Sequence, residues 1–275
     1  MASPQQSSCS CSHGANVSSC SCSTDAIDST ITFANRLDHF LARWGINRMG
    51  HRVEPGLYQL GSPTTESPVL TSANYTMSFD ALRSALAGYD AYILVLDTKG
   101  INVWCAAGRG TFGTDKLVSR IETTGLASIV THRKIIVPQL GAPGISSMDV
   151  QRRSGFKVGY GPVRASDLPE FLKTGKATPE MRRVDFLVRD RIVLVPVELV
   201  HIALPAIIVA AVLWFLAGPV AALAAIAAVV AGTVLFPILL PFIPTKVFTT
   251  KGLILSGVVA LPFAAAFASG TALPG

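Results

Sequence analysis

The stretch Ala91–Gly110 reads AYILVLDTKGINVWCAAGRG and joins a run of apolar residues to a cysteine surrounded by small residues. The continuous apolarity of Ala91–Asp97 predicts a buried strand of the kind found in parallel sheets. Cys105 then lies just beyond the carboxyl end of that strand, where α/β proteins bind their ligands. The glycines and alanines after Cys105 leave room for a large, flat molecule to approach the backbone.

Helical and extended patterns alternate on both sides of this strand. Helices are predicted within residues 33–44, 78–86, 114–125, 145–155 and 166–175, and further strands within 134–140 and 156–163. We expect Gly45 to end the first helix, which packs on the domain, and Ser78 and Ser166 to cap two others. Residues 51–69 are a Pro- and Gly-punctuated connection. The alternation implies a parallel sheet with right-handed crossovers, and hence a small Rossmann-like α/β domain of three layers.

The last third of the chain is almost free of charge. Between residues 192 and 275 the Asp, Glu, Lys and Arg residues are Glu198, Lys246 and Lys251. Apolar runs at 200–216, 219–240 and 252–268 are each about as long as a bilayer core requires, roughly 17–25 residues. They predict a C-terminal transmembrane domain of about three helices that anchors the chain. The alternative is a set of buried helices in a soluble core.

The basic residues around these runs predict an orientation. Positive charge precedes the first run and lies between the second and third, whereas the turn at Gly218 carries none. The residues concerned are Arg182, Arg183, Arg189, Arg191, Lys246 and Lys251. We therefore expect a multi-pass protein of the cytoplasmic membrane with its N-terminal part in the cytoplasm. The first 30 residues lack the apolar region of a signal peptide. The formal net charge of +6 is too modest and too scattered to indicate nucleic-acid binding.

Residues 1–25 form a Cys- and Ser-rich segment that we expect to be disordered, because it contains few large apolar groups. Its thiols form two Cys-Ser-Cys pairs on either side of His13: Cys9, Cys11, Cys20 and Cys22. Such a set could capture a soft metal ion such as Zn²⁺, Cu(I) or Hg²⁺, although the spacing is not that of a zinc finger. Reduced, unliganded thiols and disulfides are the alternatives. The expected domains are 1–25, an α/β domain at 26–190 and the transmembrane domain at 191–275.

Cys105 itself has two further interpretations. A free cysteine is commonly a small buried core residue. A nucleophilic cysteine would need a nearby base, and no histidine is spaced to suggest such a pair. The motif also lacks the order of residues that defines a phosphate-binding loop.

The segment DTKGINVWCAAGRGTFGT, residues 97–114, resembles the signature of corrinoid proteins related to the large subunit of the acetyl-CoA synthase corrinoid iron–sulfur protein. Together with the apolar C-terminus, it is more similar to the mercury-methylating corrinoid proteins, whose hallmark is N-V-W-C-A-[AG]-G-K. The stretches PGLYQLGSPTTESPVLTSANYTMSFDALR, VPQLGAPG and VELVHIALPA are also similar to that family. The resemblance covers most of the chain. It departs at Arg109, where a planar guanidinium replaces the compact ammonium of lysine, and in the Cys-rich N-terminus.

The resemblance implies that Cys105 is the catalytic residue and coordinates the cobalt of a cobalamin-type corrinoid from its lower face. It assigns a short helix and the residues after it to the binding of this cofactor: Asn102, Val103, Trp104, Cys105, Ala106, Ala107, Gly108, Arg109 and Thr111. Thr71, Asn74 and Gly141–Gly144 are further candidate contacts to the edge of the corrin. A thiolate ligand would stabilise oxidised cobalt, and so favour departure of a methyl group with its bonding electrons.

The implied function is that of a membrane-anchored corrinoid methyltransferase of an anaerobe, which transfers a methyl group from cobalt to Hg(II) and yields methylmercury. Its implied partners are a methyltetrahydrofolate-type donor system and a ferredoxin-like iron–sulfur protein, because the chain has no cluster motif of its own. We expect the Cys-rich tail to collect Hg²⁺. The alternatives are a corrinoid methyl carrier of one-carbon and acetyl-CoA metabolism without mercury activity, and a membrane-anchored soft-metal binding protein.

Overall fold

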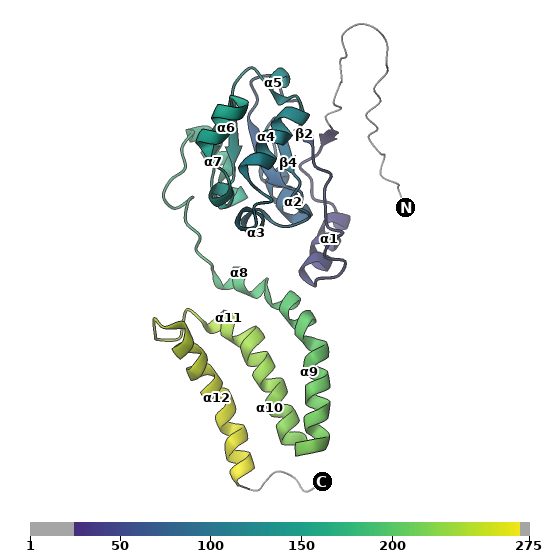
Figure 1. Ribbon diagram of the computed structural model, residues 1–275, viewed down its shortest axis with the longest axis vertical. Coiled ribbons are helices and arrows are strands. Elements are labelled where there is room, and N and C mark those ends of the chain that lie inside the picture. The colour runs from purple at the N-terminus through teal and green to yellow at the C-terminus, as the bar shows by residue number, and fades with distance from the viewer. Residues whose placement is uncertain (1–24, 270–275) are drawn as a thin grey trace. The chain divides into compact units, whose positions relative to one another are not determined.

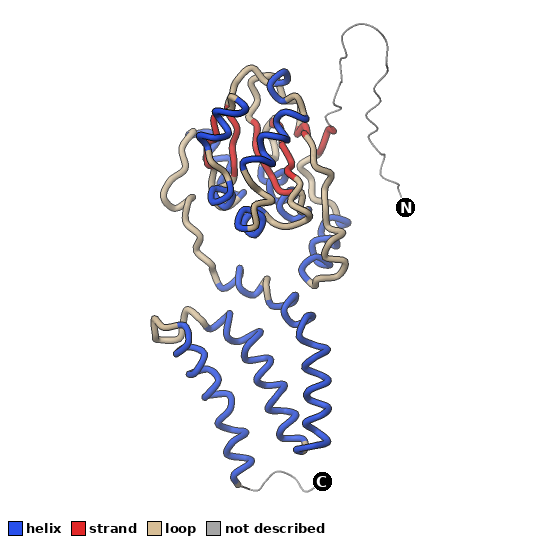
Figure 2. Tube along the Cα trace, in the orientation of Figure 1, coloured by secondary structure: helices blue, strands red, loops and turns tan. Residues whose placement is uncertain are grey.

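The computed structural model describes residues 25–269, which contacts divide into two units. Of the described residues, one unit contains 25–39 together with Met49–Val184, and it is a mixed α/β domain. The other joins Phe40–Arg48 to the chain from Asp185 onward, and it is helical (Figure 1, Figure 2). An α/β domain followed by apolar helices confirms the predicted fold class.

The α/β unit is built on one sheet of six strands in the order β1-β2-β4-β3-β5-β6. The strands β3, β4, β5 and β6 are mutually parallel, as expected, but β2 runs antiparallel to β4, with β1 parallel to β2 at the edge. The expectation of a parallel sheet is therefore wrong at β2. The bounds of the strands are Asp25–Ile27, Leu57–Leu60, Val69–Ala73, Ala91–Leu96, Lys134–Val137 and Lys157–Tyr160.

The central strand β4 shows why the domain has three layers. All six of its residues are buried, and successive side chains of a strand point to opposite faces. On one face Tyr92, Leu94 and Leu96 pack with α4 (Thr114–Thr123) and α6 (Ser147–Ser154). On the other face Ala91, Ile93 and Val95 pack with α2 (Thr76–Ala85) and α7 (Leu168–Thr174). Helices thus cover both faces of the sheet, with the short α5 (Leu126–Ile129) after α4.

The predicted helix ends are partly correct. In α1 (Phe33–Arg43), Gly45 adopts a left-handed conformation with φ +71°, and the Ile46 N–H donates to the Leu41 carbonyl at 3.0 Å. This bond is the signature of a glycine-terminated helix. The two serine caps are wrong. Ser78 lies inside α2, which begins at Thr76, and Ser166 lies in the 3₁₀ turn η2 (Ala165–Asp167) before α7.

The helix α1 contacts the α/β unit, but through its polar side. His39 Nε2 lies 2.8 Å from Asp80 Oδ2, and Asp38 Oδ1 lies 2.6 Å from His51 Nδ1. The apolar side chains of Phe33 and Leu37 are exposed. The expectation that this helix packs on the domain is therefore met by hydrogen bonds between polar side chains, not by its apolar stripe.

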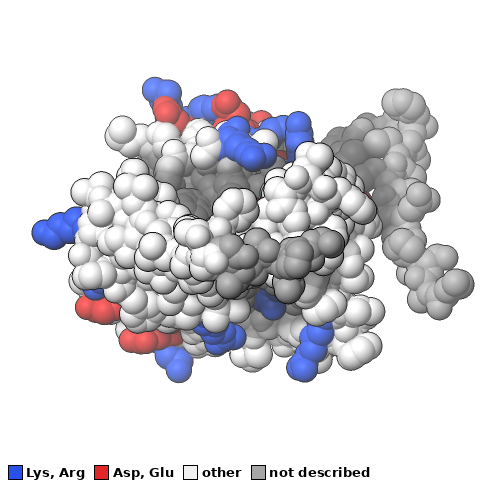
Figure 3. Space-filling model, turned by 90° about the horizontal axis from the view of Figure 1, so that it is seen from below, with Lys and Arg blue, Asp and Glu red and all other residues white. Residues whose placement is uncertain are grey.

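The helical unit contains three stretches that are long and apolar enough to cross a membrane. These are Val188–Ala217, Pro219–Leu239 and Phe248–Ala268, which match the three runs expected from the sequence. Gly218, with φ +85°, separates the first two. Figure 3 views the molecule from below. Apart from the area that grey atoms cover, the middle of this surface shows no Lys, Arg, Asp or Glu. The elements are α8 (Val188–Ile192), α9 (Val195–Ala217), α10 (Pro219–Val230), the π-helical turn η3 (Ala231–Leu235), α11 (Phe236–Leu239) and α12 (Phe248–Ala268).

Ionisation of Tyr58 on β2 is expected to lower the stability of the domain at alkaline pH. Burial, aided by the negative charges of Asp25 and Glu54, raises the pKa of Tyr58 to about 12. A group with a raised pKa contributes stability that is complete below its unfolded pKa, near 10, and is lost as the pH rises through the folded value. Between pH 10 and pH 12, wild type should lose up to about 2 kcal/mol more than Tyr58→Phe. Chemical denaturation of the detergent-solubilised chain measures this difference, and equal pH slopes for the two proteins would contradict it.

Candidate functional site

The loop between β4 and α3 (Val103–Gly108) is fixed by a buried side chain on the neighbouring strand. Asn74, directly after β3, accepts hydrogen bonds from the Thr98 N–H at 3.0 Å, the Thr98 hydroxyl at 2.9 Å and the Gly100 N–H at 3.0 Å. Lys99 and Gly100 adopt left-handed conformations that direct these donors inward. Asn74, a candidate cofactor contact in the sequence, therefore serves to position the loop that carries α3.

The helix α3 presents its thiol to solvent. Asn102 caps it, because the Asn102 side chain accepts a hydrogen bond from the Cys105 N–H at 2.9 Å. Trp104 is 53% exposed and Cys105 is exposed, whereas Ala106 and Ala107 are buried. The interpretation of Cys105 as a buried core residue is therefore wrong. The two alanines pack the buried side of α3 against the hydrophobic core.

The support beneath α3 is the 3₁₀ segment η1 (Gln139–Gly144). A Cβ on Gly144 would lie 3.1 Å from the Ala107 Cα, and one on Gly141 would lie 2.5 Å from the Phe112 ring. Both glycines are thus needed for close packing within the domain. The sequence proposed them as cofactor contacts, and the structure places them on the side of α3 that faces the core.

The carboxyl end of α3 carries the remaining predicted residues. The Thr111 and Phe112 N–H groups both donate to the Ala106 carbonyl, at 3.0 and 3.1 Å, and close the helix. Arg109 follows Cys105 by four residues, a spacing that puts both on one helical face. Within residues 25–269 its guanidinium has no hydrogen bond or ion pair, so it supplies an available positive charge beside the thiol.

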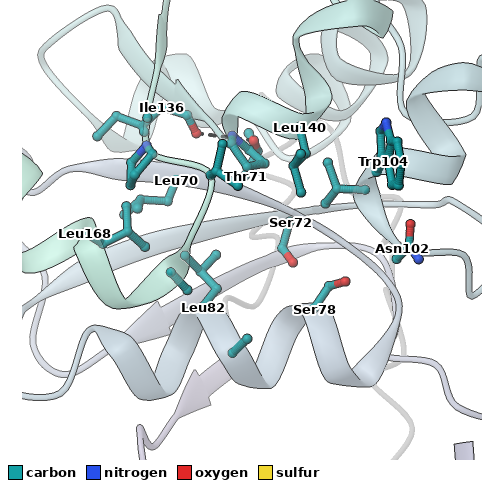
Figure 4. Close-up of a pocket in the computed structure, with 17 residues that line it drawn as sticks. Leu70, Thr71, Ser72, Ser78, Leu82, Asn102, Trp104, Ile136, Leu140 and Leu168 are labelled. Carbon is teal, nitrogen blue, oxygen red and sulfur yellow. Dashed lines mark hydrogen bonds between the residues drawn. The ribbon is translucent and has the colours of Figure 1, made fainter. Parts of the chain in front are cut away.

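A cavity of about 290 Å³ opens beside α3, at the carboxyl ends of β3, β5 and β6 (Figure 4). Its walls come from five parts of the domain that are far apart in sequence. The residues labelled in Figure 4 are Leu70, Thr71, Ser72, Ser78, Leu82, Asn102, Trp104, Ile136, Leu140 and Leu168. Asn102 and Trp104 belong to the predicted site, and Cys105 occupies the next position along α3 without lining the cavity. The cavity therefore lies where an α/β sheet is expected to bind its ligand.

The polar groups of the cavity are mostly hydrogen-bonded to the protein. The Thr71 hydroxyl donates to the Ile136 carbonyl at 3.2 Å, the dashed line in Figure 4, and the Ser72 hydroxyl donates to the Ala73 carbonyl at 3.1 Å. Gln139, which lies next to wall residues in sequence but does not itself line the cavity, differs from these groups within residues 25–269. Its Oε1 is buried without a hydrogen-bond partner, while its neighbours Pro138 and Leu140 line the cavity.

Cys105 is the one thiol within the described residues. No group of three or more His, Cys, Asp or Glu side chains comes together within residues 25–269. The proposed metal-capturing thiols Cys9, Cys11, Cys20 and Cys22 lie outside the described residues. Sequence reasoning missed the cavity walls at Ser72, Ser78, Leu82, Leu140 and Leu168. The run VLTSA after Pro68 could have predicted the strand that carries Ser72.

Comparison with known proteins gives a partial match. A family model described as CO dehydrogenase/acetyl-CoA synthase delta subunit matches residues 46–172. The chain is 35% identical over 128 residues to the acetyl-CoA decarbonylase/synthase complex subunit gamma of Methanopyrus kandleri, which is 46% of this chain and 27% of that protein. It is 34% identical over 125 residues to subunit gamma 2 of Methanosarcina mazei, 44% of this chain and 26% of that protein. The corresponding subunit of Methanothermobacter thermautotrophicus is 31% identical over 127 residues, 46% of this chain and 27% of that protein.

The chain thus spans about a quarter of the length of these curated relatives. The segment matched by the family model includes α3, η1 and all residues that line the cavity. The three apolar helices lie outside it. The similarity to subunits of acetyl-CoA decarbonylase/synthase complexes therefore lies within the α/β unit, in the segment that contains the candidate site.

Proposed function

We propose that the α/β unit binds a corrinoid and acts as a methyl carrier of one-carbon metabolism. The observation that carries this proposal is the similarity over residues 46–172 to subunits of acetyl-CoA-forming complexes, in a segment that contains both the cavity and the exposed Cys105. When bound, a corrinoid supplies a cobalt ion that can take up and release a methyl group. The protein would then have to hold the cofactor, offer a side chain that can ligate the cobalt, and exclude water.

The residues of the site fit such a group in three ways. Cys105 offers a free, exposed thiol, which would lose its proton on binding metal. Gln139, between Pro138 and Leu140 of the cavity wall, adds beside the cavity an acceptor without a partner in the described chain, and corrinoids carry amide side chains. A Cβ on Gly108 or Gly110 would have no atom within 4 Å, so this surface of the domain is open to a flat ring.

The surroundings of Cys105 would fix its thiol in place. The Asn102 cap sets the start of α3, and the buried Ala106 and Ala107 hold the helix on the domain. If Cys105 holds the cobalt, its thiolate would donate electron density to the metal and so favour release of a methyl group with its bonding electrons. Arg109 adds positive charge on the same helical face, with the planar geometry of a guanidinium in place of a point charge.

We further propose that the three apolar helices anchor the chain in the cytoplasmic membrane, with the α/β unit in the cytoplasm. Their length and composition support a membrane location, and the arginines that precede α9 support the orientation. Electrons would come from a ferredoxin-like iron–sulfur protein, and methyl groups from a methyltetrahydrofolate-type system. Both partners follow from the proposed chemistry, which needs a reductant and a donor.

A second candidate function is methyl transfer to inorganic Hg(II). Two observations favour it: the exposed Cys105 thiol, and the three apolar helices outside the segment matched by the acetyl-CoA synthase family model. Hg(II) is an electrophile and needs a methyl group that departs as a carbanion equivalent, which a thiolate ligand on cobalt promotes. The cysteines of residues 1–25 would then collect the metal.

Purification of the full chain from a cobalamin-supplied anaerobic host tests the proposal. We expect about one corrinoid per chain, visible by its absorbance, and transfer of its methyl group to an added acceptor in the presence of a reductant. Protein that retains no corrinoid under these conditions would contradict the carrier function. Adding Hg²⁺ to the same preparation separates the two candidate functions. Formation of methylmercury would support transfer to Hg(II), and transfer to other acceptors without methylmercury would support the methyl carrier.

A further inference from the structure

The helix α1 has an apolar stripe that the described protein leaves uncovered. Positions 33, 37, 40 and 44 fall on one face of a helix with about 3.6 residues per turn. Phe33, Leu37, Phe40 and Trp44 occupy them and are 81%, 47%, 55% and 36% exposed. Ala42, on the opposite side, is the buried residue of this helix. A helix on the surface of a globular protein normally turns its apolar stripe to the core, and α1 does the reverse.

The polar side of α1 explains how the helix is held in this orientation. Asp80 on α2 is largely buried and contacts both His39, at 2.8 Å, and Arg83, at 2.6 Å. Arg83 also donates to the Thr30 carbonyl at 2.9 Å, just before α1. Asp38 accepts a hydrogen bond from the Thr76 hydroxyl at 2.7 Å. Because these contacts are specific and partly buried, the exposure of the stripe is built into the domain.

The charges next to the stripe have one sign. Arg36 and Arg43 lie along one edge of it, and Arg48 follows the end of the helix. The acidic residue of α1, Asp38, faces the α/β unit through its bonds to His51 and Thr76. Aromatic and leucine side chains beside a basic edge are the composition of helices that lie in a membrane interface, where arginine reaches anionic head groups.

The residues after α1 lie beside the first candidate span. A Cβ on Gly45 would be 3.4 Å from Val197 Cγ2 and 3.9 Å from His201 Cε1, both on α9. Within this span the helix α9 has 23 residues, or about 35 Å at 1.5 Å per residue, which exceeds a hydrocarbon core of about 30 Å, and Val197 is its third residue. The first turns of the span also carry Arg189, Asp190, Arg191 and Glu198. Val197 therefore belongs to the interfacial end of the span, and Gly45 lies at that level.

We propose that α1 is an interfacial helix whose stripe of Phe33, Leu37, Phe40 and Trp44 inserts into the surface of an anionic bilayer. This proposal rests on the membrane location proposed above. The inserted helix would be a second membrane attachment in addition to the spans. It would act on the α/β unit because Asp38 and His39 fix α1 to α2. A protein partner or a second copy of the chain would cover the stripe without lipid contact, and the experiment below distinguishes these cases.

The three tryptophans of the chain permit a direct test, because one directly follows α1, one lies on α3 and one on α9. Trp104→Phe with Trp214→Phe leaves Trp44 as the reporter, and Trp44→Phe with Trp104→Phe leaves Trp214. Each full-length protein is reconstituted in vesicles of phosphatidylcholine and phosphatidylglycerol with bromine at shallow or deep acyl positions. We expect shallow bromines to quench Trp44 strongly and deep bromines to quench it little.

The Trp214 reporter separates the two proposals. If bromolipids quench Trp214 but not Trp44, the interfacial helix is refuted while the anchor stands. If Trp214 is not quenched, the membrane location fails and the interfacial helix fails with it. As a second test, Phe33→Glu should weaken quenching of Trp44 by placing a charge in the stripe. Met148→Glu changes an equally exposed apolar residue on α6, 80% exposed against 81%, and should leave quenching unchanged. Equal effects of the two substitutions would contradict insertion of the stripe.

Discussion

Replacing Cys105 with alanine is expected to lower the rate of methyl transfer by at least about 100-fold, the upper range for loss of a residue that only supports a metal ligand. The α/β unit should stay folded. Cys105 is exposed, so the substitution leaves no cavity in the core. Alanine also has the highest helix propensity, and the Asn102 cap bonds to the backbone N–H of residue 105, which the substitution keeps.

The visible spectrum of bound corrinoid distinguishes a cobalt ligand from a residue that merely lies nearby. Loss of the thiolate changes the axial ligand and should shift the absorbance of Cys105→Ala even where corrinoid is still bound. The matched control is the serine replacement of Cys9, Cys11, Cys20 and Cys22, which removes four thiols and should alter neither spectrum nor transfer to a non-mercury acceptor. An unchanged spectrum and rate in Cys105→Ala would show that cobalt is not ligated by this thiol.

The elements that could be predicted from the sequence are those whose local pattern and tertiary role agree. The strand β4 is apolar at all six positions because both of its faces are covered. The helix α4 buries Leu117, Val118 and Ile121, which recur at the period of a helix. In both cases burial alone fixes the pattern, so no knowledge of distant partners is needed.

The strands β2 and β3 escape prediction because their stability depends on distant partners. In β3 the buried Thr71 is satisfied by the Ile136 carbonyl, 65 residues away, so a polar side chain interrupts the apolar run. The four residues of β2 lie between Gly56 and Gly61 and pair antiparallel with β4. The apolar stripe of α1 shows the opposite error, since a clear helical pattern need not face the core.

For the candidate site, the sequence predicted the position of Cys105 but not the walls of the cavity. The end of β4 could be located from its composition, and the small residues that follow indicate a backbone open to a ligand. Leu82 and Leu168, by contrast, reach the cavity from α2 and α7. Both read as ordinary core residues of amphipathic helices. Only the order of the strands shows that these helices meet the carboxyl end of β3.

The substitution Gly144→Ala should destabilise the α/β unit and release corrinoid, because it disrupts the close packing of η1 against α3. The added methyl group would meet the Phe112 carbonyl oxygen, the Ala107 Cα at 3.1 Å and the Ala107 carbonyl oxygen at 3.2 Å. All three are backbone atoms, which cannot turn away as a side chain can, so α3 has to move. Overpacking of this kind typically costs about 1–3 kcal/mol, and the shift carries Cys105 with it.

Gly56→Ala is the matched control, since a Cβ there has no atom within 4 Å, and a change of that kind is usually worth less than about 0.5 kcal/mol. Thermal unfolding measures the packing cost of each variant. The amount of corrinoid retained per chain shows whether α3 still supports binding of the cofactor. If Gly144→Ala loses stability but keeps the cofactor and the rate of transfer, then α3 can move without consequence for the site. In that case the close packing of η1 serves the fold alone, and the thiol does not depend on a rigid helix.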